Sequence, residues 1–84
     1  MTPNQKQILR SNLLRQLETV RRGLPLDTLC AGALQGGFKV PALTVAEQLD
    51  WLVGKGYAAE ARADYSDVVQ IWKITEAGIE FLDR

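Results

Sequence analysis

The sequence predicts one small α+β domain, in which three helices form the core and a β-hairpin and a short helix follow. The length of 84 residues leaves room for a single hydrophobic core. Hydrophobic residues make up 46% of the chain and charged residues 24%, which is the composition of a folded domain and not of a disordered one. Apolar residues recur at helical spacing over most of the chain, and two β-prone segments joined by turn formers follow.

A capping box predicts where the first helix begins. The Thr2 side chain can accept from the amide of Gln5, the Gln5 side chain can reach back, and Pro3 occupies the first helical position, where no amide hydrogen is needed. We expect the helix to run to about Arg22 and to end at Gly23. Its apolar stripe consists of Leu9, Leu13, Leu17 and Val20, widened by Ile8 and Leu14.

A second, shorter helix is expected after a segment that contains Pro25. Asp27 or a neighbouring residue is predicted to cap this helix, which continues through Leu34 and ends at the glycine pair 36–37. The next three residues, 38–40, are β-prone and lie between glycine and proline, so they predict a minimal strand.

The third helix has two predicted starts. Either Pro41 is its first residue, or Thr44 and Glu47 form a capping box; the sequence supports both. At 100° per residue, one arc of the helix is apolar and is predicted to face the core; it carries Val45, Leu49, Leu52 and Val53. One side of the opposite arc carries Thr44, Gln48, Trp51 and Lys55, and the other side carries Glu47, Asp50 and Gly54.

Two strands and a short helix complete the expected fold. Residues 57–63 and 68–74 read as strands of a hairpin with a loop at 64–67, and side-chain alternation puts Trp72 and Ile74 on one face. Thr75 is predicted to cap the closing helix. The order of elements is that of a winged helix-turn-helix domain that spans residues 1–84.

Two motifs carry a resemblance to a known group. Residues 49–57, Leu-Asp-Trp-Leu-Val-Gly-Lys-Gly-Tyr, resemble the leucine-rich third helix and glycine stop of bacterial winged-helix regulators. Residues 74–78, Ile-Thr-Glu-Ala-Gly, resemble the exit from their hairpin. Together with the apolar pairs 8–9 and 13–14, these motifs make most of the chain similar to the small winged-helix proteins of Mu-like prophages. Such motifs describe packing and turns, so they specify fold better than function.

The resemblance implies a regulator that binds double-stranded DNA, with the third helix in the major groove and the hairpin on the adjacent backbone. The start of that helix departs from many such regulators, because Pro41, Ala42 and Leu43 offer no side-chain hydrogen bond to a base. Base contacts would then fall mostly to Thr44 and Gln48. The DNA-binding candidates are Lys39, Thr44, Gln48, Lys55, Arg62 and Lys73.

The distribution of charge supports a second hypothesis. Ten basic and ten acidic residues cancel, yet residues 1–42 carry a net charge of +4 and residues 43–84 a net charge of −4. Four carboxylates lie on the elements that would approach phosphates: Glu47, Asp50, Asp64 and Asp67. The alternative function is therefore a winged-helix module for protein–protein interaction or oligomerisation without DNA binding. The opposite charges of the two halves also favour a homodimer.

Two aromatic residues are candidates for an interaction surface. Trp51 is predicted either to anchor an interface or to pack beside the hairpin or the first helix. Tyr65 in the hairpin loop either contacts a partner or is an ordinary exposed turn residue. The basic residues of the first helix likewise form either a phosphate-binding track or a solvated face.

Enzyme, metal and membrane classes find no support in the sequence. The chain has no histidine, and Cys30 is its single cysteine, so it supplies neither a zinc ligand set nor a Ser-His or Cys-His pair. It has no P-loop and no dinucleotide-binding glycine pattern, so we expect a non-enzymatic protein without cofactors. With no long apolar run and no signal-peptide pattern near Met1, we expect a cytoplasmic protein that does not enter a membrane.

Overall fold

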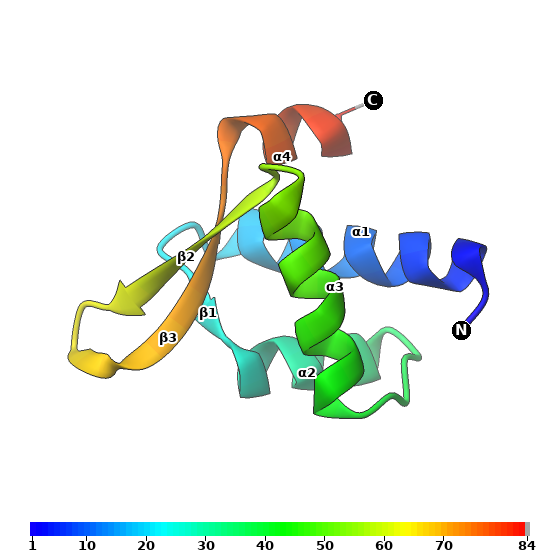
Figure 1. Ribbon diagram of the computed structural model, residues 1–84, viewed down its shortest axis with the longest axis horizontal. Helices are drawn as coiled ribbons and strands as arrows, with labels where there is room; N and C mark the ends of the chain where they lie inside the picture. The colour runs from blue at the N-terminus through cyan, green and yellow to red at the C-terminus, as the bar shows by residue number, and fades with distance from the viewer. Residues whose placement is uncertain (84) are drawn as a thin grey trace.

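The computed structural model describes residues 1–83, which form an α+β domain of four helices and one antiparallel sheet (Figure 1). The elements are α1 (Pro3–Thr19), β1 (Leu24–Pro25), α2 (Leu26–Gln35), α3 (Ala42–Gly54), β2 (Ala58–Ala63), β3 (Ser66–Ile74) and α4 (Glu76–Leu82). The strand order in the sheet is β1–β3–β2. The predicted fold class, α+β, is confirmed, and the layout is compatible with a winged helix.

The predicted capping box begins α1. Thr2 Oγ1 accepts from the Gln5 amide at 3.1 Å, and Gln5 Oε1 accepts from the Thr2 amide at 2.9 Å. The helix ends at Thr19, three residues before the predicted end. Gly23 then adopts a φ of +105°, which favours glycine, and this conformation turns the chain into β1.

The short strand predicted at 38–40 is wrong. The Phe38 amide donates to the Ala33 carbonyl at 2.9 Å, so this segment completes the C-terminal turn of α2 instead of joining the sheet. The third strand is β1, which was not predicted: Leu24 pairs with Trp72 and Pro25 with Ile71. Proline is tolerated there because β1 is an edge strand.

The starts of α2 and α3 also differ from the predictions. Pro25 is the N-cap of α2, and the Asp27 carboxylate accepts from the adjacent Thr28 amide, so Asp27 lies in the first turn and is not the cap. Pro41 is the N-cap of α3, one residue from the first of the two predicted starts. The Thr44 amide donates to the Pro41 carbonyl at 3.0 Å, so a capping box at Thr44 is wrong.

The core lies where the three longer helices meet the sheet. In Figure 1, α3 crosses in front of α1, with α2 beneath them, the sheet to one side and α4 above. The buried residues of this core are Leu9, Leu13, Leu14 and Leu17 of α1, Leu29 and Ala33 of α2, Val45, Leu49 and Leu52 of α3, and Ala58 and Trp72 of the sheet. Helix α1 contacts α2, α3, α4 and β3, so it is the element around which the fold is built.

The hairpin has a shorter loop than predicted. Regular pairing runs from Ala58–Ile74 to Arg62–Gln70, and the register then shifts so that Ala63 pairs with Ser66. This shift is a bulge in β3, and it leaves a two-residue loop. Beyond the hairpin, Thr75 caps α4 as predicted, because its Oγ1 accepts from the Gly78 amide at 3.2 Å.

Candidate functional site

The two sides of α3 differ sharply in burial and chemistry. The side facing the core carries Val45, Leu49 and Leu52, all fully buried, as predicted. The opposite side, which we call the outward side of α3, carries four exposed residues: Leu43, Glu47, Asp50 and Gly54. Leu43 is 70% exposed. The outward side therefore combines one apolar side chain with two carboxylates.

Gln48 does not lie on the outward side. It is 6% exposed, and its Oε1 accepts from Nε of Arg10 in α1 at 2.8 Å. The prediction that Gln48 faces solvent is wrong, because its position adjoins the buried arc at the boundary with α1. The sequence held a signal for this, since Val45 and Leu52 lie one helical turn before and after Gln48 on the same side. The pairing with Arg10, 38 residues earlier, had no sequence signal.

Trp51 of α3 packs against Arg10 of α1 and near Tyr57, the residue that precedes β2. The Arg10 guanidinium carbon lies 3.7 Å from the centroid of the indole ring, and Lys55 Nζ lies 5.6 Å from it. The Tyr57 ring is 6.3 Å away and itself stacks on Phe81 of α4 at 4.6 Å. Trp51 is half-buried, so the interpretation that it packs beside the first helix is confirmed.

The six candidate DNA contacts are dispersed. Lys39, Lys55 and Arg62 are exposed, Thr44 and Lys73 are half-buried, and Gln48 is buried. Lys39 precedes α3 and Lys55 follows it, so the 13-residue helix, about 20 Å long, lies between them. Arg62 and Lys73 lie on different strands of the hairpin. The structure does not bring these cations together on the outward side of α3.

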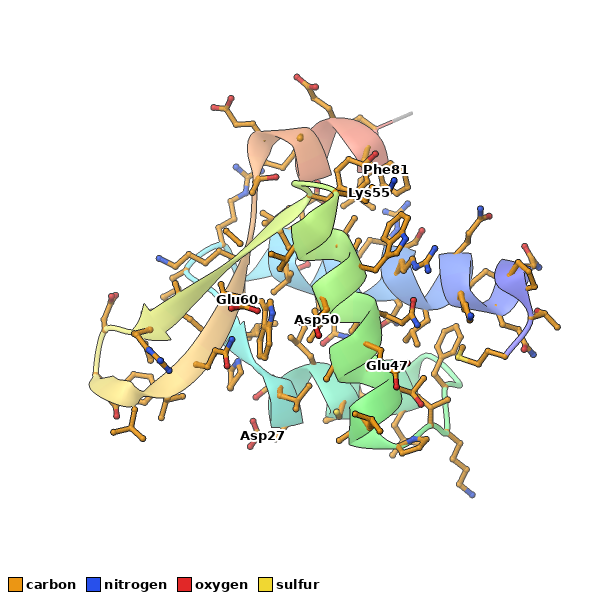
Figure 2. The ribbon with its side chains drawn as sticks, in the orientation of Figure 1. Asp27, Glu47, Asp50, Lys55, Glu60 and Phe81 are labelled. Atoms are coloured by element: carbon orange, nitrogen blue, oxygen red, sulfur yellow. The ribbon has the colours of Figure 1, made fainter. Side chains whose placement is uncertain are left out.

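Exposed acidic residues lie on two elements that pack against each other. Figure 2 shows Glu47 and Asp50 on α3 and Glu60 on β2, the strand that packs against α3. All three are exposed. We refer to Glu47, Asp50 and Glu60 as the acidic face. Glu60 was not among the predicted acidic residues, because acidic charge on the hairpin was expected at its loop. There Asp64 is exposed, and the side chain of Asp67 lies outside the described residues.

The two remaining aromatic predictions concern the hairpin. Trp72 is 6% exposed and belongs to the core. Its indole Nε1 has no hydrogen-bond partner in residues 1–83. Tyr65 is 77% exposed in the two-residue loop. It is therefore free to contact a partner, and it contributes nothing to the core.

Cys30 lacks the surroundings of a reactive thiol. Burial raises the pKa of the Cys30 thiol above its ordinary value, and the negative charge of Asp27 raises the pKa further. The nucleophilic form of cysteine is the thiolate, so both effects reduce reactivity at neutral pH.

The described residues, 1–83, contain no group of three or more metal-ligating side chains. None of the helices among them is long and apolar enough to cross a membrane. No protein-family model and no curated protein sequence matches the chain.

Proposed function

We propose that this protein is a non-enzymatic winged-helix module that binds a protein partner through Leu43 of the outward side of α3 and through the acidic face. One observation carries the proposal: the surface that a winged helix would present to DNA displays Leu43, Glu47, Asp50 and Glu60. Carboxylates there oppose phosphates, whereas an apolar residue flanked by carboxylates suits a protein.

The burial of Gln48 further weakens the case for reading bases with α3. Its side-chain oxygen is bonded to Arg10, so in this conformation the amide is withdrawn from the surface. Thr44 is half-buried, and the residues at the start of the helix, 41–43, have no polar side chain. Direct readout of a base edge needs a donor or acceptor that reaches the groove.

The chemistry of Leu43 and the acidic face together defines the partner. Three carboxylates favour a segment rich in lysine or arginine, and Leu43 favours an apolar residue within that segment. A second copy of this chain has suitable charge, because Arg15, Arg21 and Arg22 are exposed. Sedimentation equilibrium distinguishes self-association from binding to a different protein.

Fluorescence anisotropy with a labelled amphipathic Lys/Leu peptide tests the proposal. We expect saturable binding that weakens as salt is added and that is lost in the triple variant Glu47→Gln, Asp50→Asn, Glu60→Gln. The matched control neutralises three carboxylates elsewhere, with Glu18→Gln, Glu76→Gln and Glu80→Gln, and should retain binding. Equal losses in the two triple variants would show that net charge alone attracts the peptide, and they would contradict the proposal.

Binding of double-stranded DNA is the second candidate function, favoured by the exposure of Lys39, which precedes α3, and of Arg62 in β2. If DNA is the ligand, a labelled duplex should bind at low ionic strength, and each lost cation should reduce the salt dependence by about one counterion. The double variant Lys39→Ala, Arg62→Ala should then weaken binding, and the acidic-face triple variant should strengthen it. Absence of salt-dependent duplex binding would eliminate this candidate.

A further inference from the structure

A cavity of about 240 Å³ lies between α1, α3 and α4. Its walls are formed by Gln7, Arg10, Ser11, Trp51 and Phe81. Figure 2 places Phe81 and Lys55 at the same end of α3, away from Glu47. The cavity is thus separate from the surface discussed above, and it combines a cation with two aromatic rings.

Arg10 is held in one position at this cavity. Its Nε donates to the buried oxygen of Gln48 at 2.8 Å, and its guanidinium group lies over the Trp51 ring at 3.7 Å. Neither of its Nη groups donates to another residue in the described part of the chain, and neither is buried without a partner. A guanidinium group that is already oriented loses little conformational entropy when it binds a ligand.

Among residues 1–83, the only residue that Arg10 hydrogen-bonds is the neutral Gln48. The charged group that also lies over the same indole ring is a second cation, Lys55. Two free Nη donors on a planar guanidinium match the two oxygens of a carboxylate. The Trp51 and Phe81 rings beside it favour an apolar group attached to that carboxylate.

We propose that this cavity binds a carboxylate carried on an apolar or aromatic group, with Arg10 as the anion-binding residue and Trp51 and Phe81 as the apolar walls. The acid is either a small free molecule or the C-terminal carboxylate of a peptide; both present the same chemistry. The inference is independent of the proposed function, because it involves neither the acidic face nor the outward side of α3.

Titration with phenylacetate, followed by the indole N–H signal of Trp51 in an NMR spectrum, tests the proposal. The signal is assigned with Trp51→Phe. We expect saturable shifts with a Kd on the order of 1 mM, as befits a ligand of this size. Phenylacetamide, which has the same shape without the charge, should bind about tenfold more weakly or not at all. Equal binding of the two probes would overturn the proposal.

Variants of Arg10 separate a specific site from a general effect of charge. Arg10→Met keeps the length of the side chain and should weaken phenylacetate binding about tenfold, whereas Arg15→Met removes an exposed charge from the same helix and should leave binding unchanged. Gln48→Glu supplies an internal carboxylate to Arg10 and should also weaken binding, in a protein whose packing is preserved. Equal effects of Arg10→Met and Arg15→Met, or full binding in Gln48→Glu, would overturn the proposal.

A peptide ending in phenylalanine distinguishes the two sources of the carboxylate. If the natural ligand is a peptide terminus, the free acid of the peptide should bind more tightly than phenylacetate, and its C-terminal amide should not bind. If the ligand is a small acid, phenylacetate should bind at least as well as the peptide. Failure of both acids to bind overturns the inference and leaves the proposed function untouched.

Discussion

The core-facing side and the outward side of α3 differ in burial and in the contacts that their side chains make. The core-facing side is fixed by packing: Leu49 and Leu52 are fully buried, and even its polar member, Gln48, is bonded to another helix. The outward side has no partner among the described residues, and its Leu43, Glu47 and Asp50 are exposed. The comparison teaches that the first side determines whether the chain folds, whereas the second is free to determine what the folded chain binds.

The largest expected difference between the two sides comes from truncating one leucine on each. Leu49→Ala should lower the free energy of unfolding by about 2–4 kcal/mol, because it leaves a cavity in the core. Leu43→Ala should change it by less than about 0.5 kcal/mol, because Leu43 is 70% exposed. Urea denaturation measures both values, and similar losses in the two variants would contradict the distinction.

Trp51 lies between the two sides, so its truncation should have an intermediate effect. Trp51→Ala removes the ring that contacts Arg10 and Tyr57, and it should cost about 2–3 kcal/mol of stability, less than full burial would imply. Trp51→Phe keeps an aromatic ring and should recover at least half of this loss. A fully stable Trp51→Ala protein would show that the indole is a surface group after all.

Gln48 tests whether a polar residue on the core-facing side is structural. Gln48→Ala leaves the Arg10 Nε without its acceptor and should lower the free energy of unfolding by about 1–2 kcal/mol. The double variant Arg10→Met, Gln48→Ala should lose less than the sum of the two single losses, since they remove the same hydrogen bond. Additive losses in thermal unfolding would indicate that the two residues act separately.

The smallest effect is expected where α3 ends on its outward side. Gly54→Ala should raise stability by about 0.5–1 kcal/mol, because a methyl group there meets nothing within 4 Å and alanine has the higher helix propensity. Gly56→Ala should instead lower stability, because Gly56 has a φ of +80°. A gain at both positions would show that backbone conformation does not control the end of α3.

Local chemistry predicted much of the fold. The capping box at Thr2, the apolar arc of α3 and the cap at Thr75 depend on residues three or four apart, and all three predictions are confirmed. The edge strand of the sheet was predicted wrongly. The pairing of Leu24 with Trp72 joins residues 48 positions apart, and a strand of only two residues is too short to show side-chain alternation.

The candidate site was harder to predict than the fold. A helical wheel places Gln48 and Trp51 on one arc but does not show which neighbouring helix covers that arc. The packing of α1 against α3 decides which helix covers the arc. Arg10 contacts both Gln48 and Trp51, and its hydrogen bond holds the Gln48 side chain away from the surface. The two acidic residues of α3 were easier to predict. The helical wheel placed Glu47 and Asp50 correctly on the side away from the core.

Pro25 has a consequence for how the molecule unfolds. It is both the last residue of β1 and the N-cap of α2, so the sheet and the helical part meet without a linker. Displacement of β1 from β3 would pull directly on the first turn of α2. The hairpin and the helices should therefore lose structure in one cooperative transition and exchange their core amides at similar rates, so that the hairpin is an integral part of the folding unit.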